Sequence, residues 1–263
     1  MATTASVSAD NSPLHLRILI EASAATISAF TVAPAISIVD KAIVSNASGL
    51  EPLVPSLING CKSLVTNPIY FLKQPSFLFI WGVYSGTYIV ANSIEAICQR
   101  SGQDSFYPKF FGSSMANVSL SVMKDKAFAR MFGTGAPKPM SYSSMGCFAT
   151  RDSMTILASF SLPGIISKKM QNNGTSAATS DMLAQLFTPV SMQILSTPLH
   201  LYGLDMYNRS VATAAQRQEF VKTEYLKTTL ARMARIFPAF GIGGVVNKYV
   251  RKEGNAKLQT MYH

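Results

Sequence analysis

The sequence predicts an all-α membrane protein with six transmembrane helices in three pseudo-symmetric repeats. Three observations lead to this fold class. Of the 263 residues, 48% are hydrophobic and only 14% are charged, whereas roughly 25% are charged in soluble domains. The mean hydropathy is positive, at +0.21. Stretches with few or no Asp, Glu, Lys and Arg residues recur in three pairs, with a period of roughly 80 residues.

The six expected spans differ in strength. A helix needs roughly 20 mostly apolar residues to cross the hydrocarbon core of a bilayer. The stronger spans contain no Asp, Glu, Lys or Arg and cover residues 22–39, 74–94 and 182–204. The weaker ones cover residues 110–123, 143–167 and 236–247, and Arg151 and Asp152 interrupt the second of these.

Each pair of spans encloses a basic, amphipathic connector, at residues 53–73, 124–142 and 209–230. We expect these connectors to form short amphipathic helices. An aspartate recurs near the end of the first span of each pair, as Asp40, Asp125 and Asp205. We therefore expect one membrane domain over residues 1–263. Its repeats lie at about 15–100, 105–170 and 178–252, and residues 1–14 form an N-terminal arm.

The charge pattern argues against nucleic-acid binding. The 23 basic and 13 acidic residues give a net charge of +10, but the basic residues form no single stripe. Basic loops between membrane spans explain this excess better. Residues 1–14 contain neither Arg nor Lys, so we expect no cleavable presequence.

Residues with reactive side chains are dispersed along the chain. The cysteines and histidines show no metal-ligand spacing: Cys61, Cys98, Cys147, His15, His200 and His263. The segment Gly60-Cys-Lys-Ser63 lacks the earlier glycine and the preceding strand of a phosphate-binding loop. No arrangement of nucleophile, base and acid is evident. We therefore expect neither a metal site nor an enzyme.

Three sequence segments resemble motifs of a known family: Ser196-Thr-Pro-Leu-His200, Gly146-Cys-Phe-Ala-Thr-Arg-Asp152 and Leu230-Ala-Arg-Met-Ala-Arg-Ile-Phe-Pro238. Together with the threefold repeat, they resemble the mitochondrial carrier family over about residues 18–249. The resemblance implies the carrier fold. It also implies a ring of ion pairs that closes the matrix side, built where the odd-numbered helices end in Pro-x-Asp/Glu-x-x-Lys/Arg.

The chain departs from that carrier pattern in every repeat. At the expected gate positions, the first span has Pro34, Ile36 and Val39, the third has Ser121, Met123 and Lys126, and the fifth has Pro198, His200 and Gly203. No complete acid–base pair survives at these positions. Asp40, Asp125 and Asp205 are displaced from the places that the ring requires. We therefore expect a degenerate gate and weak or absent transport.

The middle of the expected cavity is better preserved. The resemblance places Arg151 and Asp152 on the fourth helix, Arg235 on the sixth and Asn92 on the second, at positions that contact solutes in carriers. An ionisable side chain inside a membrane span is energetically costly, so its presence there indicates a functional role. The alternative is that Arg151 and Asp152 only hold the bundle together and that Arg235 is a snorkelling residue at a helix end.

Three hypotheses follow. The first is a non-transporting structural or accessory subunit of a respiratory or ATP synthase complex. The second is an active exchanger of a small amino-acid-like or carboxylate solute in the inner membrane. The third is a soluble helical scaffold. We expect the mitochondrial inner membrane rather than the outer one, with the basic connectors in the matrix. The bilayer and other membrane subunits are the expected partners. We expect no cofactor apart from bound phospholipid such as cardiolipin.

Overall fold

The computed structural model describes residues 12–134 and 138–262, apart from the side chains at positions 160, 161, 240 and 241. All regular structure in this part of the chain is helical, which confirms the all-α class. Most of the expected arm at 1–14 lies outside the described residues. The elements are α1 (Leu14–Ser48), α2 (Leu53–Thr66), α3 (Pro68–Leu72), α4 (Pro75–Arg100), α5 (Phe106–Phe132), α6 (Tyr142–Ile156), η1 (Leu157–Ser161), α7 (Leu162–Asn172), α8 (Ala177–Asn208), α9 (Ala214–Phe237), η2 (Pro238–Gly243) and α10 (Gly244–Tyr262).

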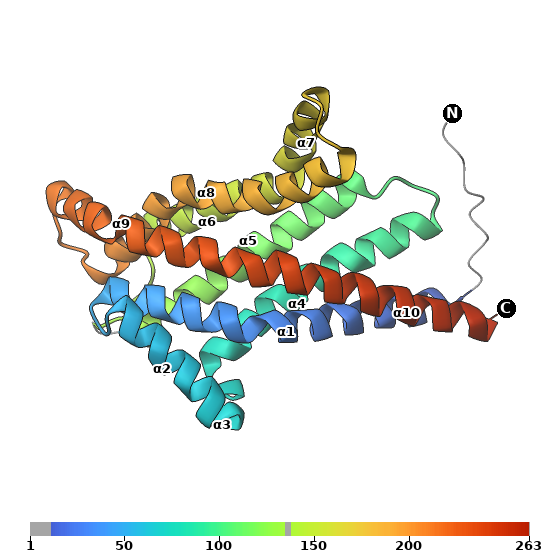
Figure 1. The fold of residues 1–263 in the computed structure, drawn as a ribbon. Coiled ribbons are helices and arrows are strands. Elements are labelled where there is room, and N and C mark those ends of the chain that lie inside the picture. The colour runs from blue at the N-terminus through green and yellow to red at the C-terminus, as the bar shows by residue number, and fades with distance from the viewer. Residues whose placement is uncertain (1–11, 135–137, 263) are drawn as a thin grey trace.

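The long helices lie side by side and alternate in direction (Figure 1). Helices α1, α5 and α8 finish at one end of the bundle, which we call the connector end because α2 and α3 project from it. The opposite end, where α1 begins and α10 finishes, we call the terminal end (Figure 1). Residues 53–73 form separate short helices, α2 and α3. The third connector does not, because most of it belongs to α9, which begins at Ala214 and continues through η2 into α10 as the last long helical rod.

Two of the helices, α1 and α4, are long and apolar enough to cross a membrane by length and composition. Large apolar side chains are also exposed on the other rods, for example Phe111, Met115, Phe187, Leu195 and Val245. Such extensive exposed apolar surface is unusual for a soluble monomer and typical of a lipid-facing protein. The arrangement of six spans stays a prediction.

Small side chains let α1 lie close to its neighbours. Ala25, Ala29 and Ala33 recur every four residues on α1 and are completely buried, a spacing that brings membrane helices close together. Against α4, the ring of Phe30 meets that of Trp81 edge to face, with centroids 5.6 Å apart. The indole nitrogen of Trp81 donates to the carbonyl oxygen of Thr26 at 3.0 Å.

Two rods are interrupted by π-helical segments, η1 between α6 and α7 and η2 between α9 and α10. A proline lies at or next to each π-helical segment, and proline cannot donate a backbone hydrogen bond. Pro163 leaves the carbonyl of Ser159 without its usual donor, and Pro238 does the same to Ala234. Such segments often occur at functional sites.

The crossing of α6 and α8 depends on a glycine. A Cβ atom on Gly203 would lie 2.8 Å from a ring carbon of Phe148 and 3.2 Å from the Cβ of Cys147, whereas one on Gly146 would meet nothing within 4 Å. We predict that Gly203→Ala lowers the free energy of unfolding by about 1–3 kcal/mol through overpacking. Gly146→Ala should not lower it. Melting temperatures of the detergent-purified variants test this, and equal destabilisation by both would contradict it.

Candidate functional site

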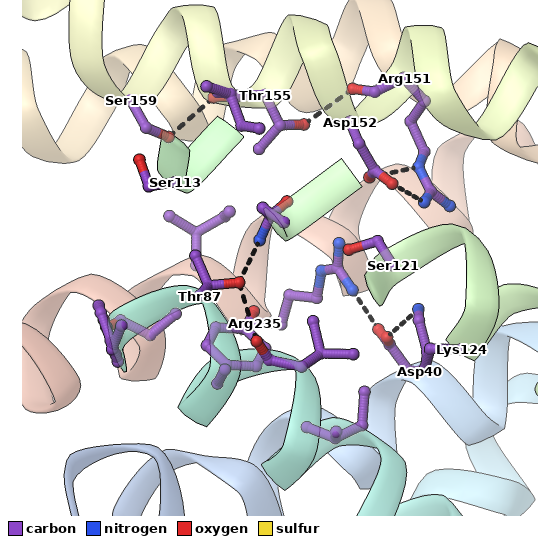
Figure 2. A pocket seen from close by; sticks show the side chains of 18 residues that line it. Asp40, Thr87, Ser113, Ser121, Lys124, Arg151, Asp152, Thr155, Ser159 and Arg235 are labelled. Carbon is purple, nitrogen blue, oxygen red and sulfur yellow. Dashed lines mark hydrogen bonds and ion pairs between the residues drawn. The ribbon is translucent and has the colours of Figure 1, made fainter. Parts of the chain in front are cut away.

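A cavity of about 130 Å³ lies inside the bundle. Residues of α1, α4, α5, α6, η1, α9 and η2 line it, and Figure 2 shows their side chains. At about 30 Å³ per water in the liquid, this volume holds about four water molecules. It therefore has room for a small solute.

Two polar stripes face the cavity. On α5, Ser113, Asn117, Ser121 and Lys124 follow one another at intervals of three or four residues and line the same space. Residues at these intervals share one face of a helix. On the neighbouring wall, α6 and η1 contribute a second stripe that runs through Arg151, Thr155 and Ser159 (Figure 2).

Most hydroxyl groups that line the cavity donate their hydrogen to a backbone carbonyl oxygen. Thr155 donates to the carbonyl of Arg151 at 3.1 Å, Ser159 donates to that of Thr155 at 2.8 Å, and Thr87 of α4 donates to that of Val83 at 2.8 Å. A hydroxyl that donates in this way still offers oxygen lone pairs. The part of the cavity lined by Thr87, Thr155 and Ser159 is therefore rich in hydrogen-bond acceptors for a solute with N–H groups.

An ionic cluster forms the wall of the cavity toward the connector end. We call it the inner network, and it consists of Asp40, Lys124, Asp125, Arg151, Asp152 and Arg235. The Nζ atom of Lys124 lies 2.9 Å from Asp40 Oδ2 and 2.7 Å from Asp125 Oδ1. The Nη2 atom of Arg151 lies 2.5 Å from Asp125 Oδ2 and 2.7 Å from Asp152 Oδ2. Arg235 also pairs with Asp40 (Figure 2).

The inner network joins four rods, because its members lie on α1, α5, α6 and α9. Its acidic and basic groups alternate along the chain of contacts, and all of them are mostly or fully buried. Buried charges are tolerated only when they are paired and hydrogen-bonded. Three carboxylates therefore balance three cations.

A histidine attaches α8 to the inner network. The Nδ1 atom of His200 lies 2.6 Å from Arg151 Nη1. A guanidinium group only donates, so Nδ1 must be the acceptor. In residues 12–134 and 138–262, no group of three or more His, Cys, Asp or Glu side chains could hold a metal ion.

A second polar cluster lies about one helical turn beyond the cavity, toward the terminal end. We call it the outer network, and it consists of Glu21, Asn92, Glu95, Lys109, Asn247, Arg251 and Asn255. Arg251 of α10 pairs with Glu21 of α1 and, at 2.8 Å, with Glu95 of α4. Lys109 of α5 pairs with Glu95 at 3.0 Å. The cavity therefore lies between two polar networks.

The structure brings together three of the four residues predicted to contact a solute. Arg151, Asp152 and Arg235 all line the cavity. The fourth, Asn92, lies in the outer network, where its amide donates to Asn247 at 3.0 Å and to the carbonyl of Glu21 at 3.2 Å. Whether any of them contacts a solute stays a prediction.

Opposite charges do pair between the first and third spans, although not at the predicted gate positions. Asp40 of α1 and Lys124 of α5 form such a pair at 2.9 Å. The carrier motif predicts gate residues at Val39 and Lys126. The residues that pair are instead Asp40, one position after Val39, and Lys124, two positions before Lys126. On a helix this shift turns the side chain to another face, and Lys126 is indeed exposed.

The other predicted gate residues are scattered. Ser121 lines the cavity, and His200 bonds Arg151. Ile36 belongs to the core, with Val39 packed against it. Met123 is 62% exposed and faces outward. The remaining positions lie inside helices α1 and α8: Pro34, Pro198 and Gly203.

Sequence reasoning missed the cavity-lining roles of Thr87, Asn117 and Lys124. A signal for Lys124 is present in the sequence. Polar residues recur at positions 113, 117, 121 and 124 of a mostly apolar segment, and this helical period predicts a polar interior face.

Comparison with known proteins gives a family. A family model described as "Probable citrulline exporter" matches residues 24–255, which is nearly the whole chain. Among curated proteins, none matches. The expected membership of the mitochondrial carrier family is therefore wrong. The phrases that carried the resemblance are short, and each lacks part of the carrier motif.

The central acid of the inner network offers a stability test. Asp40→Asn removes a charge that neutralises both Lys124 and Arg235. Removing one partner of a buried pair leaves an uncompensated charge, which costs about 3–5 kcal/mol. We predict a clear fall in melting temperature for Asp40→Asn. The matched change Glu253→Gln, at an exposed position of α10, should have almost no effect. An unchanged melting temperature for Asp40→Asn would contradict the network as described.

Proposed function

The chain belongs to the probable citrulline exporter family, and on this premise we propose that it is a membrane transporter of an amino-acid-like solute, with citrulline as the leading candidate. The observation that carries the proposal is the cavity itself. It combines positive and negative side chains along one wall with neutral hydrogen-bonding groups along the others. An amino-acid zwitterion presents both signs of charge, so this wall complements it.

The proposed binding mode assigns each part of citrulline to a part of the cavity. The carboxylate binds Arg235, which has the most exposed side chain of the three cations in the inner network, at 14%. The ammonium group binds Asp152, which also lines the cavity. The uncharged ureido side chain lies along Thr87, Thr155 and Ser159, whose oxygens accept from its N–H groups.

Transport further requires that the inner network opens. We propose that the solute's own charges replace pairs such as Arg235 with Asp40 and so lower the cost of separating them. The charged side chains pair with one another when the network is closed and are hydrated when it is open. The desolvation cost of burying them is therefore avoided in both states. The outer network then closes the opposite side of the cavity.

In the membrane, the proposal has six spans formed by α1, α4, α5, α6 with α7, α8, and α9 with α10. What supports it is the apolar outer surface of these rods around a polar interior. Placement in the mitochondrial inner membrane stays a prediction, as does bound phospholipid such as cardiolipin. We propose no cofactor and no catalysed reaction.

Transport is favoured over the structural-subunit hypothesis for a specific reason. That hypothesis rested on a gate without opposite charges, and the pair of Asp40 with Lys124 removes its basis. Family membership independently favours an exporter. Association with other membrane subunits stays a prediction.

The proposal predicts the effect of removing Arg235. In Arg235→Gln, Asp40 keeps Lys124 as its partner, so the fold should be destabilised less than in Asp40→Asn, while the solute loses its carboxylate-binding cation. We expect citrulline uptake into liposomes that contain the purified protein to fall at least about tenfold, since a charge-assisted hydrogen bond contributes about 1.5–3 kcal/mol.

The matched control is Arg130→Gln, which removes the same charge from an exposed position on α5 and should leave uptake unchanged. Absence of amino-acid uptake by the folded wild-type protein would overturn the proposal. Equal uptake by Arg235→Gln and the wild type would overturn the binding mode.

A further inference from the structure

A buried arginine beside the inner network has no acidic partner. Arg232 of α9 is only 1% exposed. Its Nη2 atom donates to Gln193 Oε1 at 2.8 Å and to Ser196 Oγ at 3.1 Å, both on α8. Its Nε atom has no hydrogen-bond partner. No carboxylate of the described residues forms an ion pair with it.

Arg232 changes the charge balance around the cavity. The inner network is neutral, because three carboxylates match three cations. Arg232 lies one helical turn from Arg235 and therefore adds a fourth cation next to the site. His200 does not change this balance, because its Nδ1 accepts from Arg151. The side chains around the site thus carry one uncompensated positive charge.

A purely structural role does not account for this arginine. An unpaired buried guanidinium is costly, and an apolar side chain of similar size would usually be at least as stable. A glutamate in place of Gln193 would give Arg232 an ion pair, whereas the amide present accepts from Arg232 and donates to the Pro189 carbonyl at 3.0 Å. The positive charge is therefore held in place and left unneutralised.

We propose that Arg232 sets the charge specificity of the transporter: its field selects amino acids with an uncharged side chain and excludes those with a cationic one. This inference rests on the proposed function. A zwitterion can place its carboxylate toward the excess charge, whereas the second cation of lysine or ornithine is repelled. The expected discrimination is about tenfold, as Coulomb's law gives for unit charges roughly one helix diameter apart at an effective dielectric constant of about 20.

The test measures competition for citrulline uptake in proteoliposomes. Unlabelled citrulline, ornithine and lysine compete with labelled citrulline, and the ratio of their half-inhibitory concentrations is compared between proteins. Arg232→Gln removes the charge. Gln193→Glu keeps the guanidinium but neutralises it, at the cost of the hydrogen bond from Gln193 Nε2 to the Pro189 carbonyl, and it is the second variant if Arg232→Gln does not fold. Arg232→Lys keeps the charge, and Arg130→Gln is the exposed control.

The wild type, Arg232→Lys and Arg130→Gln should all prefer citrulline to ornithine and lysine by about tenfold. In both Arg232→Gln and Gln193→Glu this preference should largely disappear. A change in packing alone would alter total uptake without changing the ratio, so the ratio separates an electrostatic from a structural role.

Two outcomes overturn the inference while leaving the proposed function intact. One is citrulline uptake by a wild type that does not discriminate against cationic amino acids. The other is a preference that persists in both Arg232→Gln and Gln193→Glu. If the wild type neither transports any of these amino acids nor is thermally stabilised by them in detergent, the proposed function and this inference fail together.

Discussion

The rest of the structure depends on one constraint, which is that charges buried among apolar helices must be neutralised by one another. Asp40, Lys124, Asp125, Arg151, Asp152 and Arg235 satisfy it by alternating in sign along a single chain of contacts. Because the members come from four rods, the contacts also fix how these rods meet. The cost of separating such groups in a low-dielectric interior makes the closed arrangement stable, and it makes opening dependent on replacement charges.

The cavity owes its position to the arrangement of polar residues on the rods. Helical spacing on α5 and α6 directs hydroxyl, amide and charged groups inward, while large apolar side chains such as Met115 and Leu195 face outward. The proline-associated segments η1 and η2 pass along the same space. The inner network forms one wall of the cavity and the outer network lies beyond its other end, which is the arrangement that the proposed transport requires.

Much of this architecture could be predicted from sequence. Uncharged stretches located the long helices, and the carrier resemblance, although wrong about the family, placed Arg151, Asp152 and Arg235 in one cavity, where the structure has them. Pairing between distant residues could not be predicted in this way, because the partner of Asp40 is 84 residues away and a shift of one or two positions moves a side chain to another helix face. The carrier resemblance failed for the same reason, since short motif fragments do not fix which residues meet.

The central claim, that the cavity is the solute path, is tested most directly by thiol protection. In a background without the three native cysteines, Ser121→Cys places a thiol in the cavity wall, and Met123→Cys places one on the outward face of the same helix. The account predicts that a charged, membrane-impermeant thiol reagent modifies Ser121→Cys and that citrulline slows this reaction, with no effect of citrulline on Met123→Cys. Modification of Ser121→Cys at the same rate with and without citrulline would contradict the account.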